Sequence, residues 1–131
     1  MQEKLKELLN NAYAPYSNYK VSAVLVCNDG PEFGGVNIEN ASYSGTVCAE
    51  RVAIYSAIAK GYRKDDFQEL HVMASSEIIV SPCFICRQVF VELLNDDVIV
   101  YLYNVDGDVQ KYKVKDLCPL PFNNDNLGSD K

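Results

Sequence analysis

Hydrophobic positions along this chain switch repeatedly between a helical and a strand spacing. Apolar residues three and four apart predict helices over residues 2–13, 47–60 and 81–94. Valine-rich or alternating apolar runs predict strands over 20–27, 33–38, 70–74, 98–103 and 109–114, and a short helix is expected over 115–117. This order, α-β-β-α-β-α-β-β-α, predicts an α/β fold, a three-layer α-β-α sandwich around one mixed five-stranded sheet.

Residues that start and stop secondary structure separate these segments. Turn-forming residues at 28–31 and 105–108 are typical of hairpins between neighbouring strands. Pro15 is expected to end the first helix, Thr46 to cap the second, and Gly61 to stop it. The polar tail over 123–131 is expected to be only partly ordered.

Length and composition indicate an ordinary globular protein. The chain has 131 residues, 48% hydrophobic and 23% charged, which predicts a single domain over 1–131. Charged residues interrupt the leucines at the N-terminus, whereas a signal peptide needs a continuous apolar stretch. No apolar run approaches the roughly 20 residues that span a bilayer. We therefore expect a cytoplasmic protein with no membrane partner.

The charge balance bears on the class of partner. The formal net charge is −6, and the basic residues Lys111, Lys113 and Lys115 alternate as on a solvated strand instead of forming a cluster. Binding to a phosphate backbone depends on neutralisation by lysine and arginine. The sequence thus predicts no nucleic-acid partner and leaves a small neutral molecule open.

Three cysteines and a glutamate carry the most specific chemistry. Cys48-Ala49-Glu50 and Cys83-Phe84-Ile85-Cys86 both lie where a helix is predicted to start, a position that stabilises thiolates. Three thiolates can hold a zinc ion and leave a fourth position for water, beside which Glu50 could act as a proton carrier. Arg51 could offset the negative charge of three thiolates.

These residues also have other interpretations. Cys83 and Cys86 alone would fit a redox pair, and Glu50 could simply favour the helix dipole. The histidine at position 71 could be a fourth ligand of a structural zinc, although its place within a strand favours a packed or surface side chain. The odd cysteine count argues for reduced thiols, with Cys27 and Cys118 interpreted as core residues.

At this point the chain resembles the small, homotetrameric, zinc-dependent cytidine deaminases. The resemblance runs from Ala14 to Leu127. It is carried by Ala14-Pro15-Tyr16-Ser17-Asn18-Tyr19-Lys20-Val21, Asn37-Ile38-Glu39-Asn40-Ala41-Ser42-Tyr43, Cys48-Ala49-Glu50-Arg51, Ser81-Pro82-Cys83-x-x-Cys86-Arg87-Gln88 and Leu117-x-Pro119-x-x-Phe122.

The resemblance implies a specific activity and site. It implies conversion of cytidine and 2′-deoxycytidine to uridine and 2′-deoxyuridine, with one Zn²⁺ per chain and Glu50 as the catalytic residue. A nucleoside partner and a homotetramer with shared active sites are implied as well. The implied zinc ligands are Cys48, Cys83 and Cys86; the implied substrate-binding residues are Tyr19, Asn37, Glu39, Tyr43, Ala49, Ser81 and Phe122; and Arg51 and Gln88 are expected to support the site.

The sequence departs from this family at three positions. Phe84 and Ile85 stand where small residues are usual between the last two cysteines, and Ser22 replaces a strand glycine. This bulk could narrow the pocket or alter subunit packing. It motivates an alternative, a deaminase of a related aminopyrimidine nucleoside such as a nucleoside antibiotic; a non-catalytic zinc or redox module is a further alternative.

Overall fold

The predicted order of helices and strands is confirmed. The computed structural model describes residues 1–128. Its regular elements are α1 (Gln2–Leu9), β1 (Val21–Cys27), β2 (Glu32–Val36), α2 (Ala49–Ala59), β3 (Phe67–Ala74), α3 (Phe84–Leu93), β4 (Ile99–Tyr103), β5 (Val109–Lys113) and α4 (Val114–Leu117). Short 3₁₀ turns lie at Tyr43–Gly45, Lys64–Asp66 and Asn124–Leu127. The prediction that residues 123–131 are only partly ordered includes residues 129–131, which lie outside the described part of the chain.

The five strands form one mixed sheet in the order β2-β1-β3-β4-β5. β1 is antiparallel to both β2 and β3, β3 is parallel to β4, and β4 is antiparallel to β5. The parallel pair is possible because α3 carries the chain back across the sheet between β3 and β4.

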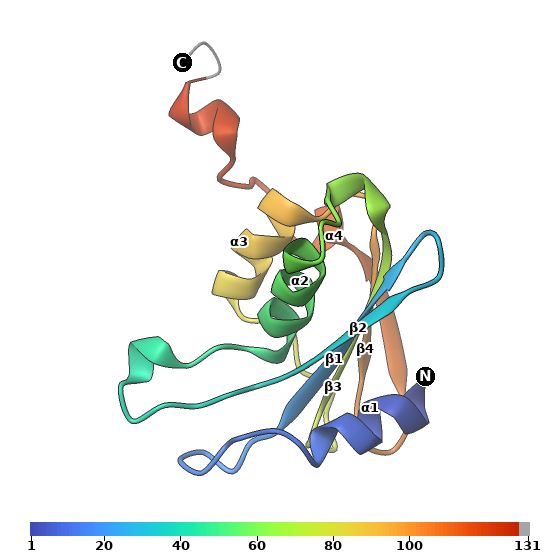
Figure 1. Cartoon of the computed structure of the whole chain (residues 1–131), viewed down its shortest axis with the longest axis vertical. Coiled ribbons are helices and arrows are strands. Elements are labelled where there is room, and N and C mark those ends of the chain that lie inside the picture. Colours follow the sequence, from blue (N-terminus) through green and yellow to red (C-terminus); the bar gives the residue numbers. More distant parts are fainter. Residues whose placement is uncertain (129–131) are drawn as a thin grey trace.

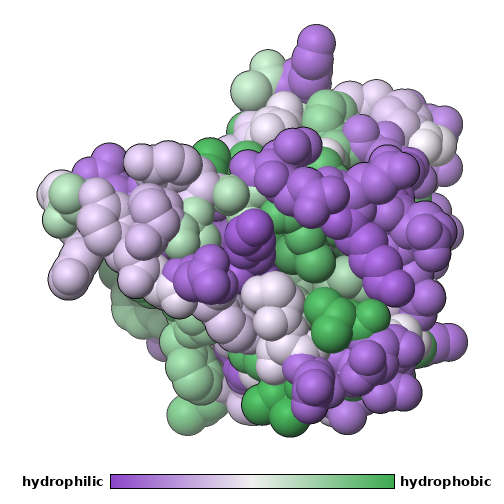
Figure 2. Space-filling view, turned by 90° about the horizontal axis from the view of Figure 1, so that it is seen from below, coloured by the Kyte–Doolittle hydropathy of each residue, from purple (hydrophilic) through white to green (hydrophobic). Residues whose placement is uncertain are grey.

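Helices cover both faces of the sheet, so the three-layer prediction is also confirmed. α1 packs on β1, β2 and β3 from one side, while α2 contacts the same strands from the other. Figure 1 shows α3 and α4 on the same side as α2, with the segment after α4 extending away from the body. Seen from below, the molecule exposes hydrophilic residues around several hydrophobic patches (Figure 2). Among the described residues, every helix falls short of the length and apolar character that a membrane crossing requires.

Strand alternation divides the buried residues into two clusters. The larger lies between the sheet and α2 and α3, and contains Leu70 and Phe90. The smaller lies under α1 and contains Leu5 and Met73. Because successive strand residues point to opposite faces, the three central strands β1, β3 and β4 contribute to both clusters.

Two polar residues are buried on the α1 side. The Ser22 hydroxyl donates a hydrogen bond of 2.8 Å to the carbonyl of Leu5, so this serine links β1 to α1. His71 is paired through its ring nitrogens with the Tyr103 hydroxyl at 2.8 Å and with Glu69 at 3.1 Å. The preference for a packed histidine over a zinc ligand is therefore confirmed.

Two local predictions were wrong. α1 ends at Leu9 instead of continuing to residue 13, and the Tyr13 amide donates to the carbonyl of Asn37. Thr46 does not cap α2, whose N-cap is Cys48; the Thr46 hydroxyl accepts a hydrogen bond from the Asn40 amide. In both cases, contacts to the segment after β2 replace the local hydrogen bonds that the sequence suggested.

Candidate active site

Two helix N-termini bring the three predicted ligands together. Cys48 is the N-cap of α2 and Cys83 is the N-cap of α3, as expected from the two motifs. Cys86 lies one turn further along α3, is fully buried, and its backbone amide donates to the Cys83 sulfur at 3.4 Å. The positive ends of both helices therefore face the same three sulfurs.

The spacing of these sulfurs fits a zinc ion. The Sγ atoms of Cys48 and Cys83 are 3.6 Å apart, those of Cys83 and Cys86 are 3.3 Å apart, and all three lie within 4.8 Å of one another. A tetrahedral zinc with bonds of about 2.3 Å to sulfur places its ligands about 3.8 Å apart. Three thiolates and no fourth protein ligand among the described residues match the donor set of a catalytic site.

Arg51 and the thiols set the electrostatics of this centre. The Arg51 guanidinium lies 3.6 Å from the Cys48 sulfur and 3.5 Å from the Thr46 carbonyl. Hydrogen bonds from Cys86 and Arg51 lower the pKa of the Cys48 thiol to about 5 despite burial. In contrast, the hydrogen bond with Cys48, together with burial, raises the pKa of the Cys86 thiol.

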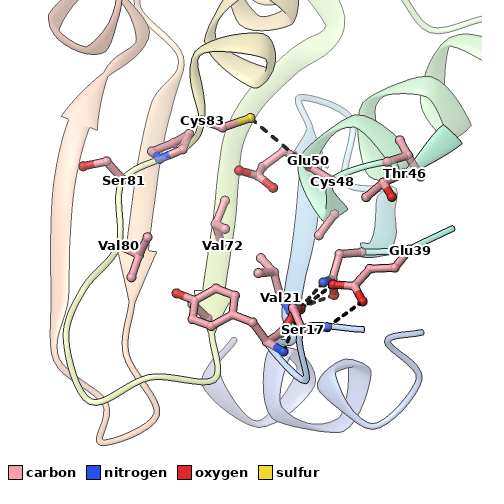
Figure 3. A pocket seen from close by; sticks show the side chains of 16 residues that line it. Ser17, Val21, Glu39, Thr46, Cys48, Glu50, Val72, Val80, Ser81 and Cys83 are labelled. Atoms are coloured by element: carbon pink, nitrogen blue, oxygen red, sulfur yellow. Dashed lines mark hydrogen bonds between the residues drawn. The ribbon is translucent and has the colours of Figure 1, made fainter. Parts of the chain in front are cut away.

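Glu50 is positioned beside the sulfurs but is not one of the clustered ligands. Its side chain is only 4% exposed, on the first turn of α2. Figure 3 shows its carboxylate near Cys83 and Cys48, facing the pocket. Burial raises the pKa of Glu50 to about 7. A carboxyl group with this pKa can both accept and release a proton near neutral pH.

A pocket with a volume of about 330 Å³ adjoins this centre. It lies where β2 and β3 end and β1 begins, and its walls include Val21, Val47, Val72 and Val80. A concave, mainly apolar site of this size with a few polar groups is typical of small-molecule binding.

Most of the predicted site residues meet in this pocket. Those that line it are Tyr19, Asn37, Glu39, Cys48, Ala49, Glu50, Ser81 and Cys83. Cys86 and Arg51 lie directly behind it, at the sulfurs. Ala49 and Ser81 come from opposite walls, the first from α2 and the second from the loop before α3.

The other predicted residues lie outside this pocket. Tyr43 is 81% exposed in a neighbouring hollow that shares Glu39 and Thr46 with it. Phe122 lies across α3, where its carbonyl accepts a hydrogen bond of 2.9 Å from the Gln88 side chain. Gln88 therefore holds the C-terminal segment and does not contact the sulfurs.

The two bulky residues between Cys83 and Cys86 point away from the pocket. Phe84 is 78% exposed and Ile85 is 63% exposed, and neither lines the pocket. The Phe84 ring stacks under the Arg87 guanidinium at 4.5 Å. They therefore do not narrow the pocket within this chain, and their expected effect on subunit packing stays a prediction.

Ser17 and Gly35 are two residues that sequence reasoning did not assign to the site. Ser17 lines the pocket and contacts Glu39. Gly35, on β2, faces α2 so closely that a Cβ atom would meet the Ala49 carbonyl and lie 2.6 Å from the Ala53 nitrogen. Adjacent glycines within a predicted strand are a signal for such a close approach.

Gly35→Ala should damage both stability and activity. The added methyl group would push against the backbone of α2, which cannot yield as a side chain can, and overpacking costs typically about 1–3 kcal/mol. Moving the start of α2 by 1 Å would displace Cys48 and Glu50 and reduce turnover by roughly 10²-fold. Thermal unfolding and steady-state kinetics measure the two effects.

Gly34→Ala is the matched control for this substitution. A Cβ atom at position 34 would lie 3.2 Å from Cδ1 of Leu8, the flexible end of a side chain on α1. We expect near-wild-type activity from this variant. Equal activity losses in both variants would show that the approach of β2 to α2 does not hold the site.

Comparison with known proteins agrees with this geometry. Residues 1–102 match the family model "Cytidine and deoxycytidylate deaminase zinc-binding region". The chain is 43% identical over 122 residues to the cytidine deaminase of Sporosarcina psychrophila, and the aligned region covers 93% of this chain and 88% of that protein. It is 46% identical over 111 residues to the cytidine deaminase of Halalkalibacterium halodurans, covering 85% of this chain and 83% of that protein.

Solved structures show the same fold. Cytidine deaminase from Burkholderia pseudomallei superposes with a TM-score of 0.88 at 47% identity, covering 92% of this chain and 94% of that one. Cytidine deaminase from Mycobacterium tuberculosis superposes with a TM-score of 0.79 at 28% identity, covering 94% of each chain. The three clustered thiols beside a buried glutamate agree with these matches. Because the family model and these relatives match most of its length, the chain belongs to the cytidine and deoxycytidylate deaminase family.

Proposed function

We propose that this protein hydrolyses cytidine and 2′-deoxycytidine to uridine and 2′-deoxyuridine, releasing ammonia. The observation that carries the proposal is the buried Glu50 beside three clustered sulfurs, in a pocket that also holds Asn37 and Glu39. The cytidine deaminases among its relatives support the choice of substrate.

The proposed reaction requires water to replace the exocyclic amine of the pyrimidine ring. Zinc, held by Cys48, Cys83 and Cys86, would supply a Lewis acid that lowers the pKa of a water molecule. Glu50 would take one proton from the attacking water and pass it to ring N3. It would then move the second proton, from the hydroxyl now bound to the ring carbon, to the exocyclic amine, whose bond to the ring breaks to release ammonia. Its pKa of about 7 suits a group that has to both receive and donate a proton.

The remaining pocket residues would orient the nucleoside. Backbone groups of Ala49 and Ser81 would contact the edge of the base, and Tyr19 would form a wall of the pocket. Glu39 would bind the 3′-hydroxyl of the sugar, assisted by Asn37. A carboxylate at this position would repel a 3′-phosphate, so we propose free nucleosides and not nucleic acids as substrates.

A turnover assay with and without a chelator tests this function. Purified protein should contain about one zinc per chain and change the ultraviolet absorbance of cytidine, and chelation should abolish the change. Readdition of zinc should restore activity. A zinc-loaded protein that leaves cytidine and 2′-deoxycytidine unchanged would contradict the proposed substrate without affecting the family assignment.

We also propose a homotetramer whose subunits share active sites. Large apolar residues lie exposed near the start of α3 and on the C-terminal segment, including Phe84, Ile85, Leu120 and Phe122. Phe84, Leu120 and Phe122 line one hollow, and adjoining exposed apolar residues are typical of protein interfaces. The segment after α4 extends away from the body (Figure 1), which would allow Phe122 to stack on a pyrimidine in a neighbouring subunit.

Subunit mixing tests the shared site. Phe122→Ala should reduce kcat/KM roughly tenfold or more through lost stacking, without changing the zinc content. Refolding this variant together with Glu50→Ala should recover activity, because some sites would then combine an intact Glu50 with a partner's intact Phe122. Light scattering should give the mass of four chains of 14.6 kDa. A fully active monomer would overturn the proposal.

The cellular setting follows from the same chemistry. All five cysteines are free thiols, which suits a reducing compartment, so we propose a cytoplasmic location. We further propose that residues 1–131 act as a single domain in pyrimidine salvage, with a nucleoside as the small-molecule partner.

A further inference from the structure

The loop before β1 holds the Glu39 carboxylate at both oxygens. The backbone amides of Tyr16 and Ser17 donate to Oε1 at 3.0 and 3.1 Å, and the Ser17 hydroxyl donates to Oε2. Figure 3 shows Ser17 beside Glu39, joined by the hydrogen bonds that Ser17 donates. Glu39 therefore has a fixed orientation although it is only partly buried.

Asn37 ties the same loop to the sheet. Its side-chain oxygen accepts from the Val21 amide at 2.9 Å, and its side-chain nitrogen donates to the Tyr19 carbonyl at 2.8 Å. The Ser17 hydroxyl also accepts from the Tyr19 amide at 3.0 Å. The loop and the segment after β2 thus form one hydrogen-bonded unit, in which Asn37 acts on the backbone and Glu39 faces the pocket.

These three hydrogen bonds limit how many more the Glu39 carboxylate can accept from a ligand. An ionised carboxylate offers about four acceptor positions. Oε1 already accepts two hydrogen bonds and Oε2 accepts one, so one position remains, on Oε2. The hydrogen bond from Ser17 also lowers the pKa of Glu39, which keeps the group an acceptor.

We propose that Ser17 is a positioning residue of the sugar site, which orients Glu39 so that Oε2 accepts one hydroxyl group of the substrate. This inference rests on the proposed nucleoside substrate. It assigns Ser17 a role in binding the sugar and none in the proton transfers, because the hydroxyl contacts Glu39 and not Glu50 or the sulfurs.

Kinetics with two substrates test the inference. Ser17→Ala should raise KM for cytidine roughly five- to tenfold with kcat within about twofold, because a sugar contact affects binding in the ground and transition states alike. For 3′-deoxycytidine, which has no hydroxyl for Glu39, kcat/KM should change less than about twofold. Ser17→Thr, which keeps the hydroxyl, should restore the wild-type KM for cytidine.

Ser75→Ala is a matched control, because Ser75, which follows β3, binds the last residue of the same loop. The Ser75 hydroxyl accepts a hydrogen bond of 2.9 Å from the Lys20 amide and makes no hydrogen bond to Glu39. This variant should keep the wild-type KM. Equal KM increases in Ser17→Ala and Ser75→Ala, or equal losses with both substrates, would mean that Ser17 merely holds the loop and would overturn the inference.

A double substitution tests the same coupling from Glu39. In a Glu39→Gln background, Ser17→Ala should change kcat/KM for cytidine by less than about twofold, since the group that it positions has been altered. Independent, multiplicative losses would contradict a shared role. Absence of cytidine turnover in the wild-type protein would instead refute the proposed substrate, so the two failures are distinguishable.

Discussion

Glu50→Ala should reduce kcat for cytidine by roughly 10²–10⁴-fold, the range expected when a general acid–base group is removed. Glu50 is the buried carboxyl that faces the pocket beside the three sulfurs, and its pKa of about 7 suits proton transfer near neutral pH. The three thiols remain in place, so the variant should still bind about one zinc per chain. Steady-state kinetics and metal analysis measure the two quantities.

Stability separates this effect from a general loss of structure. Burying an ionisable carboxyl group costs free energy of folding. The Glu50→Ala variant should therefore unfold at a temperature no lower than that of the wild type. Glu50→Gln, which keeps the size of the side chain, should lose activity to a similar extent. Glu92→Gln, an exposed position on α3, is the control and should be fully active.

Retained activity would change the assignment. If Glu50→Ala stayed within about tenfold of the wild type, proton transfer by this glutamate would be excluded. The zinc or redox module that the cysteine motif alone leaves open would then become the better interpretation of Cys83 and Cys86.

Cys86→Ser should abolish zinc binding at neutral pH and with it all measurable turnover. Cys86 is one of three clustered sulfurs and is fully buried at the start of α3. Serine is nearly isosteric, but its neutral hydroxyl is a poor substitute for the thiolate that zinc prefers. Two remaining sulfurs would be too few to retain the ion through dialysis, and metal analysis would show this directly.

Cys118→Ser is the control for the loss of a thiol. The Cys118 sulfur is partly buried and lies 3.5 Å from the Arg87 carbonyl, away from the three sulfurs. This variant should retain about one zinc per chain and near-wild-type kcat. Zinc retained by Cys86→Ser, or lost equally by both variants, would contradict the assignment of Cys86 as a ligand.

The order of the elements was predictable because each one carries its own periodic signal. β1 and α2 are examples: their apolar positions repeat at strand and helical spacing, and the structure places both within three residues of the predicted ends. The end of α1 and the cap of α2 were not predictable in this way. The Tyr13 amide and the Thr46 hydroxyl bind the segment after β2, and such distant partners leave no local pattern.

The chemistry of the site is readable from residue types and spacing: three cysteines and a glutamate at two helix starts define which groups can hold zinc and move protons. The arrangement of these groups and of their neighbours depends on the folded chain. Folding turned Phe84 outward, brought β2 against α2 at Gly35, and joined Ser17 to Glu39 across 22 positions of the chain. Residue type sets what a side chain can do, whereas its partners depend on packing between distant segments, which local spacing does not encode.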